Sequence, residues 1–179
     1  MLVIFLGTLY KRMTWGQTQV PENYRLSAVY VHSTQTFAEV DDFVDNCSET
    51  YGLQITKYPF PLKEAFSKYL EKEPHVKAIF VGIRRSDPYG DQLKYQQQTD
   101  HGWPDFVRIH PVLEWHYAEI WEFLRTLSIP YCHLYDMGYT SLGGTNNTVR
   151  NPLLANKDGT FQPAYELVGD DNERLGRTK

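Results

Sequence analysis

The feature that most restricts how this chain can fold is an alternation of strand-like and helix-like segments between residues 26 and 81. Three short runs rich in β-branched and aromatic residues are typical of buried strands: Leu26 to Val31, Leu53 to Tyr58 and Lys77 to Val81. Amphipathic helices are expected between them, over Thr36 to Tyr51 and over Leu62 to Lys72. Strands that alternate with helices at this spacing predict a parallel sheet covered by helices, with right-handed crossovers.

The rest of the chain is less regular. Met1 to Met13 has leucines at helical spacing and predicts a helix. Residues 82–105 form a long polar stretch, and a loop of that length in a compact domain is usually functional or disordered. Phe106 to Val112 is expected to return to the sheet, and an amphipathic helix is expected from Tyr117 to Leu127 with Trp121 in the core. We expect one α/β domain over residues 1–179.

Composition excludes several classes of function. The net charge of −4 argues against a basic nucleic-acid surface. Cys47 and Cys132 are the only cysteines and form no paired motif, so neither a disulfide framework nor a zinc site is expected. No segment approaches the ~18 consecutive apolar residues of a membrane span. We therefore expect a soluble cytoplasmic protein without metal-ligating side chains.

A ligand site is expected after the third strand, because open parallel sheets bind ligands beyond the carboxyl ends of their strands. Gly82 and Ile83 lead into a loop in which Arg84 and Arg85 offer planar donors for a phosphate. Asp87 is a candidate to hydrogen-bond a ring or to help hold a magnesium ion. The alternative is a solvated turn with incidental charges.

Two further segments carry candidate binding residues. Trp103 and Asp105 are suited to stack on a flat heterocycle and to accept its imide N–H, although a core tryptophan and a turn aspartate are the simpler interpretation. Near the C-terminus, Arg174 and Arg177 are spaced so that both reach one polyphosphate; the alternative is a frayed basic terminus. An earlier segment, Tyr139 to Gly143, supplies the hydroxyls of Tyr139 and Ser141, the apolar Leu142 and the glycine Gly143.

Taken in order, these motifs resemble the fungal and animal FAD synthetases. The likeness is carried by VGIRRSDPYG (81–90), TDHGWPDFVRIHPVLEW (99–115), YTSLG (139–143), NPLL (151–154) and ERLGR (173–177). That family belongs to the superfamily of PAPS reductases and other pyrophosphate-loop enzymes. The resemblance implies a three-layer, open, mostly parallel sheet of the adenine nucleotide alpha hydrolase-like, Rossmann-like type. It also implies an FMN adenylyltransferase that uses ATP and Mg²⁺, releases FAD and pyrophosphate, and acts as a monomer.

The resemblance also implies roles for individual residues. Those matching the flavin-binding motifs are Gly82, Ile83, Arg84, Arg85, Asp87, Trp103 and Asp105. Val31 and Phe37 lie in the segment that matches the family's adenine-nucleotide site, and Arg174 and Arg177 match C-terminal arginines that engage substrate phosphates. Further residues expected to bind the ligands are Tyr139, Ser141, Leu142 and Gly143. The residues implied in catalysis are Asp87, Arg174 and Arg177.

One departure from the family pattern affects the expected activity. The family has a strand and a Ser-x-Gly-Gly-Lys-Asp phosphate loop before its first helix, and no such motif occurs in these 179 residues. The backbone N–H groups of that loop would bind the phosphates of ATP, so ATP binding is expected to weaken without them. We therefore expect a truncated chain with little or no activity. Three alternatives stay open: a sulfonucleotide reductase, although no cysteine follows Cys132; a non-catalytic flavin-binding module; and a fragment unable to fold.

Overall fold

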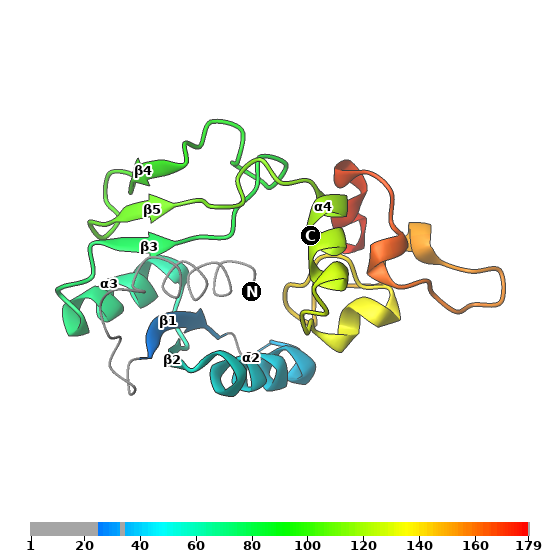
Figure 1. Cartoon of the computed structure of the whole chain (residues 1–179), viewed down its shortest axis with the longest axis horizontal. Helices are drawn as coiled ribbons and strands as arrows, with labels where there is room; N and C mark the ends of the chain where they lie inside the picture. The colour runs from blue at the N-terminus through cyan, green and yellow to red at the C-terminus, as the bar shows by residue number, and fades with distance from the viewer. Residues whose placement is uncertain (1–24, 33–34, 179) are drawn as a thin grey trace. The chain divides into compact units, whose positions relative to one another are not determined.

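The computed structural model describes residues 25–32 and 35–178 (Figure 1). The helix expected over Met1 to Met13 lies outside these residues. The described part divides into two compact units, one made of residues 25–32 and 44–113 and the other of residues 35–43 and 114–178. Each unit is considered by itself, and one domain over the whole chain stays a prediction.

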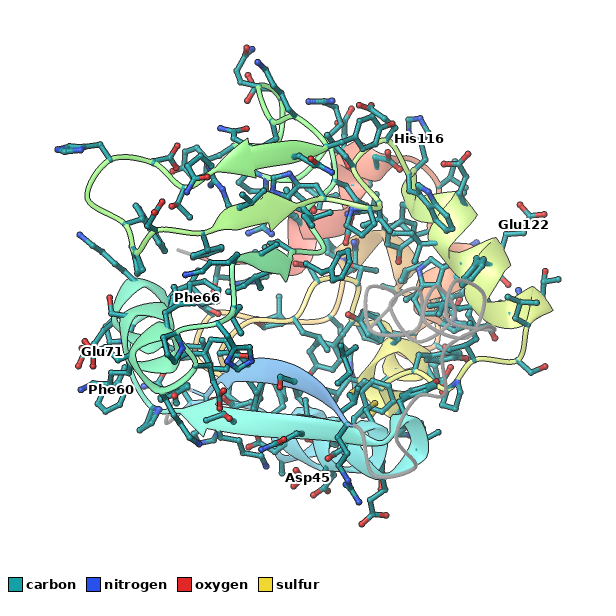
Figure 2. The ribbon with its side chains drawn as sticks, turned by 60° about the vertical axis from the view of Figure 1, so that its left-hand side comes forward. Asp45, Phe60, Phe66, Glu71, His116 and Glu122 are labelled. Atoms are coloured by element: carbon teal, nitrogen blue, oxygen red, sulfur yellow. The ribbon has the colours of Figure 1, made fainter. Side chains whose placement is uncertain are left out.

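The first unit begins with a parallel strand pair. β1 (Leu26–Val31) lies beside β2 (Leu53–Tyr58), with Leu26 opposite Leu53 and Val31 opposite Tyr58. α2 (Ala38–Tyr51) precedes β2 and ends at Gly52, whose φ of 60° is a left-handed conformation common after helices. An exposed ion pair joins Lys57 to Asp45 at 2.6 Å (Figure 2). Because both side chains are solvated, the pair contributes little to stability.

A second sheet in the same unit carries the loop of interest. β3 (Ala78–Phe80), β5 (Val107–Ile109) and β4 (Gln96–Gln98) lie side by side in the order β3-β5-β4 (Figure 1). β3 pairs with β5 in parallel, and β4 pairs with β5 antiparallel.

Helix α3 (Leu62–Lys72) precedes β3 and has the bounds that the sequence predicted. Its inner face buries Ala65 and Tyr69, and Phe66 packs on Phe106 with ring centroids 5.1 Å apart. The outer face carries charged side chains such as Glu71 (Figure 2). The amphipathic pattern therefore predicted both the helix and the face that it buries.

The mixed α/β fold and its parallel strand pairing are confirmed, and the strands of the described residues form two sheets, β1-β2 and β3-β5-β4. The predicted third strand shortens to three residues and pairs with β5, not with β1 or β2. β4 was missed inside the long polar stretch, because three glutamines at a sheet edge show no alternation of polar and apolar residues.

The second unit is organised around α4 (Tyr117–Thr126). Trp121 of this helix is buried, as predicted, and four tyrosine rings meet it edge-on: Tyr117, Tyr131, Tyr135 and Tyr165. The chain then runs through short 3-10 helices: η1 (His133–Met137), η2 (Pro152–Leu154), η3 (Ala164–Glu166) and η4 (Asp170–Gly176). Across residues 25–32 and 35–178, no helix combines the length and apolar character needed to cross a membrane.

Candidate functional site

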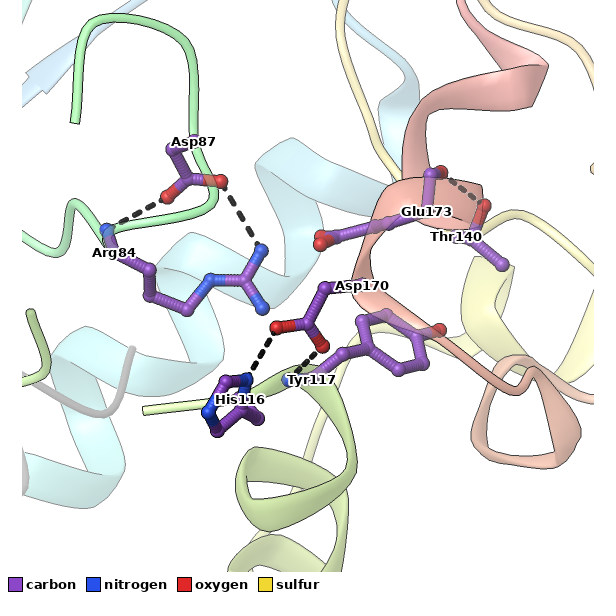
Figure 3. A network of polar contacts seen from close by, with 7 residues as sticks. All are labelled: Arg84, Asp87, His116, Tyr117, Thr140, Asp170 and Glu173. Atoms are coloured by element: carbon purple, nitrogen blue, oxygen red, sulfur yellow. Dashed lines mark hydrogen bonds and ion pairs between the residues drawn. The ribbon is translucent and has the colours of Figure 1, made fainter. Parts of the chain in front are cut away.

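The loop that follows β3 is locked by a pair of opposite charges. The Arg84 backbone N–H donates to Asp87 Oδ2 at 2.8 Å, and Arg84 Nη2 donates to Asp87 Oδ1 at 3.1 Å (Figure 3). Arg84 is only 5% exposed, so its charge is taken out of water and needs this partner. The loop is therefore a built feature of the fold, unlike a solvated turn with incidental charges.

Arg85 holds the same loop from its other side. Its Nη1 lies within hydrogen-bond distance of three backbone carbonyls, at 3.1 Å from Gly90, 3.0 Å from Asp91 and 2.7 Å from Leu93. Its backbone N–H donates to Leu113 O at 2.6 Å, beyond β5. The guanidinium expected to face a phosphate thus supports the loop backbone, and any phosphate contact competes with these bonds.

The tip of the loop is a tight turn. Gly90 N–H donates to Asp87 O at 2.9 Å, which places Pro88 and Tyr89 at the two central positions. Gly90 is buried, and a methyl group there would overlap the carbonyl oxygen of Arg84. Glycine is required at this position because the chain folds back on itself.

The structure does not bring Trp103 and Asp105 to this loop. β3 and β5 are parallel, and Arg84 follows the carboxyl end of β3 whereas Trp103 precedes the amino end of β5. The two pairs of residues therefore lie at opposite ends of the sheet. Trp103 is 38% exposed, and Asp105 accepts a hydrogen bond from Gln98. That all four residues bind one flavin stays a prediction.

A buried histidine at the carboxyl end of β5 was not predicted to be part of a site. His110 is fully buried, with Nδ1 2.7 Å from Lys94 O. Its Nε2 has no hydrogen-bond partner within the described residues. Nδ1 therefore donates in this contact, because a carbonyl oxygen can only accept.

In the second unit, residues distant in the sequence meet around Gly143. The ring of Phe37 packs edge-on against Tyr139 with centroids 5.5 Å apart. The Gly143 N–H donates to Thr148 Oγ1 at 3.0 Å, and the guanidinium of Arg177 lies directly against the Gly143 backbone. The fold thus brings together four of the residues that the sequence predicts to bind a ligand: Phe37, Tyr139, Gly143 and Arg177. Ser141 and Leu142 are half-buried in the same segment, and Val31 lies in the first unit at the end of β1.

The environment of Arg177 favours an anion. Burial lowers the pKa of its guanidinium, and the positive charge of Arg174 lowers that pKa further. Arg177 Nε is buried without a hydrogen-bond partner in the described chain, and Nη2 donates to Asn147 Oδ1 at 3.5 Å. Arg177 is partly buried and Arg174 is exposed near it in the sequence, and a bound phosphate would stabilise both positive charges.

A buried polar cluster positions the C-terminal segment, and the sequence analysis missed it. Asn151 is fully buried, and its Nδ2 donates to Thr140 Oγ1 at 2.9 Å and to Asn172 O at 2.8 Å. Thr140 Oγ1 donates in turn to Glu173 O at 2.6 Å (Figure 3). The Asn-Pro pair at 151–152 is a helix-start signal that could have marked this residue.

A second contact attaches η4 to the start of α4. Asp170 Oδ1 accepts a hydrogen bond from the Tyr117 N–H at 2.8 Å, and Asp170 Oδ2 lies 2.7 Å from His116 Nδ1 (Figure 3). A carboxylate at a helix N-terminus satisfies unpaired N–H groups and suits the helix dipole. Asp170 and Asn151 together fix the segment that carries Arg174 and Arg177.

The described residues contain no group of three or more His, Cys, Asp or Glu side chains that could hold a metal ion. Both carboxylate oxygens of Asp87, the residue suggested for magnesium, accept hydrogen bonds from Arg84. Within residues 25–32 and 35–178, therefore, no side-chain cluster suits a resident magnesium ion.

Comparison with known proteins gives consistent results. Residues 12–150 match the model of the phosphoadenosine phosphosulfate reductase domain. The chain is 46% identical over 178 residues to a probable FAD synthase of Schizosaccharomyces pombe, covering 98% of this chain and 67% of that protein. It is 39% identical over 136 residues to the flavin adenine dinucleotide synthase of Saccharomyces cerevisiae, covering 73% of this chain and 44% of the yeast protein.

Solved structures support the same assignment. The crystal structure of Candida glabrata FMN adenylyltransferase in complex with FMN and the ATP analogue AMPCPP superposes with a TM-score of 0.86 at 31% identity. The match covers 97% of this chain and 76% of the crystallised one. A PAPS reductase from Candida auris matches at a TM-score of 0.55 and 18% identity, which shows a shared fold alone.

Proposed function

The chain belongs to the FAD synthase family, within the phosphoadenosine phosphosulfate reductase domain superfamily, and from this we propose that it transfers AMP from ATP to FMN. The products would be FAD and pyrophosphate. The identity of 46% across 98% of the chain is the observation that carries the proposal. A sulfonucleotide reductase is not favoured, because the PAPS reductase of Saccharomyces cerevisiae is only 28% identical over 124 residues.

The proposed reaction needs charge stabilisation more than a base. A phosphate oxygen of FMN forms a bond to the α-phosphorus of ATP, and the bond from that phosphorus to the pyrophosphate oxygen breaks. A phosphomonoester has its second pKa near ~6, so the nucleophile is already an anion at neutral pH. Arg174 and Arg177 are proposed to bind phosphates and to stabilise the negative charge on pyrophosphate as it leaves.

We propose that the flavin is held by the first unit. The Arg84–Asp87 pair and the Gly82–Ile83 backbone at the carboxyl end of β3 are the proposed contacts. Trp103 and Asp105 stay proposed flavin ligands, at the other end of the sheet, and they are tested separately by Trp103→Ala and Asp105→Asn. A loss of FMN binding in these variants supports a contact there, and unchanged binding removes both residues from the site.

Mg²⁺ is proposed to enter with ATP as part of the substrate. Magnesium commonly keeps several waters and is held through substrate phosphates, which agrees with the lack of a carboxylate cluster in the described residues. We further propose a monomer in the cytoplasm; Cys47 and Cys132 are both buried thiols, as is usual in a reducing compartment. Light scattering and cell fractionation would test these two points.

The decisive experiment incubates the purified chain with FMN, ATP and MgCl₂ and separates the flavins by chromatography. Equal amounts of FAD and pyrophosphate are expected, and an Arg174→Gln, Arg177→Gln double variant is expected to form much less of both. The alternative outcome is a flavin-binding module without transferase activity. FMN binding without any FAD formation would support that candidate and reject the transferase.

A further inference from the structure

The tyrosine at the tip of the β3 loop has an unusual backbone conformation. Among the described residues other than glycine, Tyr89 and Ser128 are the ones with positive φ, at 65° and 52°. This left-handed region is unfavourable for a bulky side chain, because its Cβ crowds the backbone. A non-glycine residue there needs an explanation in either packing or function.

Ser128 has a structural explanation. It follows α4, where Ile129 N–H donates to Leu124 O at 2.8 Å and Ser128 N–H donates to Arg125 O at 3.1 Å. Left-handed residues commonly end helices in this way and satisfy the last carbonyls. The conformation of Ser128 is therefore part of a helix cap.

Tyr89 lies in a turn that favours glycine at its position. The turn runs from Asp87 to Gly90, with proline at the second position and a positive φ at the third. A turn of this kind normally places glycine or asparagine third. The sequence has glycine one residue later, where the buried backbone requires it, and a tyrosine at the strained position.

The surrounding loop prevents the turn from relaxing. Asp87 is fixed to Arg84 by two hydrogen bonds, and Arg85 Nη1 contacts the carbonyls that follow the turn, including that of Gly90. Both ends of the turn are thereby held. The left-handed conformation of Tyr89 is imposed by the loop and does not depend on contacts of its own ring.

The ring of Tyr89 has almost no packing contacts within the fold that would offset the strained backbone. Tyr89 is 92% exposed, so almost none of its apolar surface is removed from water. Hydrophobic packing therefore does not explain an aromatic residue at a position that suits glycine. The remaining explanation is a contact with a molecule that binds at this loop.

We propose that the Tyr89 ring stacks on the isoalloxazine ring of FMN, an inference that rests on the proposed function and adds a flavin-binding residue to it. The rigid turn presents the ring without the entropic cost of ordering a flexible loop. An electron-rich phenol is a good stacking partner for an electron-poor isoalloxazine, in an offset parallel arrangement. The position lies at the carboxyl end of β3, where ligands of parallel sheets bind.

The test uses variants that separate the ring from the backbone. Tyr89→Gly and Tyr89→Asn remove the ring and suit a left-handed residue, Tyr89→Phe keeps a ring, and Tyr95→Ser is a control at another exposed tyrosine. FMN affinity is measured by quenching of flavin fluorescence, ATP affinity by calorimetry, and fold stability by thermal unfolding.

We expect Tyr89→Gly to raise the midpoint of thermal unfolding while weakening FMN binding about tenfold, the scale of one lost aromatic stack. Tyr89→Asn should weaken FMN binding similarly, whereas Tyr89→Phe and Tyr95→Ser should stay within about twofold of the unmodified chain. Higher stability together with weaker binding cannot result from a merely structural role.

Unchanged FMN affinity in Tyr89→Gly, or weaker binding of ATP and not of FMN, would overturn this inference. Either result leaves the proposed function intact as long as the unmodified chain still forms FAD. If the unmodified chain neither quenches FMN fluorescence nor forms FAD, the proposed function fails, and the stacking role fails with it.

Discussion

The guanidinium of Arg177 lies against the backbone of Gly143 so closely that a single methyl group at position 143 would overlap Nη2 and Cζ. The two residues lie 34 positions apart in the sequence. The contact is held by the antiparallel bridge between Thr148 and Arg177, and by Thr148 Oγ1, which accepts from the Gly143 N–H at 3.0 Å. Gly143 therefore leaves room for an arginine head group that is proposed to bind phosphate.

Gly143→Ala should displace this guanidinium without unfolding the chain. We expect kcat/KM for FAD formation to fall at least about tenfold, equivalent to ~1.4 kcal/mol of transition-state stabilisation. Gly144→Ala is the matched control, because its methyl group meets mainly the flexible side-chain oxygen of Asn146 and should be milder. Equal activity of Gly143→Ala and the unmodified chain would show that the position of Arg177 is not critical.

Asp87→Asn should weaken both the loop and the binding of FMN. The substitution keeps the shape of the side chain and removes the negative charge opposite a buried guanidinium. We expect a loss of about 1–3 kcal/mol in the free energy of unfolding, the range for hydrogen bonds to charged groups. Urea unfolding followed by circular dichroism measures the loss, and FMN titration measures binding. Unchanged stability would mean that Arg84 does not depend on this carboxylate.

Asn151→Ala should be strongly destabilising. It removes three hydrogen bonds from a fully buried side chain and leaves Thr140 and the Asn172 carbonyl with fewer partners. We expect a loss of about 2–4 kcal/mol in the free energy of unfolding. Asn156→Ala provides the control, because this asparagine bonds to Thr160 in an exposed turn and should lose only about 0.5 kcal/mol. Similar losses in both variants would argue against a special role of the buried cluster.

The raised pKa of Tyr131 predicts that the free energy of unfolding falls as the pH rises in the alkaline range. Burial raises the pKa of its phenol to about 12, and a hydrogen bond to Asp136 at 2.9 Å acts in the same direction. The folded state therefore keeps this proton where the unfolded state, with a pKa near ~10, loses it. The stabilisation is complete below pH ~10 and is lost as the pH rises towards about 12.

Tyr131→Phe should remove that part of the pH dependence. Urea unfolding of both proteins between about pH 8 and pH 11 gives two slopes, and the slope of the unmodified chain should be the steeper one. The other tyrosines contribute equally to both and cancel in the difference. Identical slopes would mean that the proton of Tyr131 is not linked to folding.

Local patterns predicted local structure well. The bounds of α3 and the burial of Trp121 followed from apolar residues at helical spacing. The parallel pairing followed from alternating strands and helices. The partner of each strand was not predictable in this way, because β3 and β5 are joined by a polar segment whose edge strand, β4, has no apolar face.

In the candidate site, too, local features were predictable from the sequence and contacts between distant residues were not. The sequence identified the β3 loop and the C-terminal arginines, and the structure shows how each is held. The sequence did not reveal which of two adjacent arginines would hold the loop through its guanidinium contacts with three carbonyls, because local backbone direction decides this. Nor did it show that Trp103 and Arg84 lie at opposite ends of the sheet, since a list of motifs carries no strand direction. The Asn151 cluster depends on contacts between distant residues, and a single sequence hides these.

The three carbonyl contacts of Arg85 depend on the length of the loop that follows it. One nitrogen reaches the carbonyls of residues 90, 91 and 93 only when the number of residues after position 85 is right. An insertion or deletion in that interval would move at least one carbonyl out of reach. Relatives that keep this arginine should therefore keep the same spacing, and relatives with a longer or shorter segment should have replaced it.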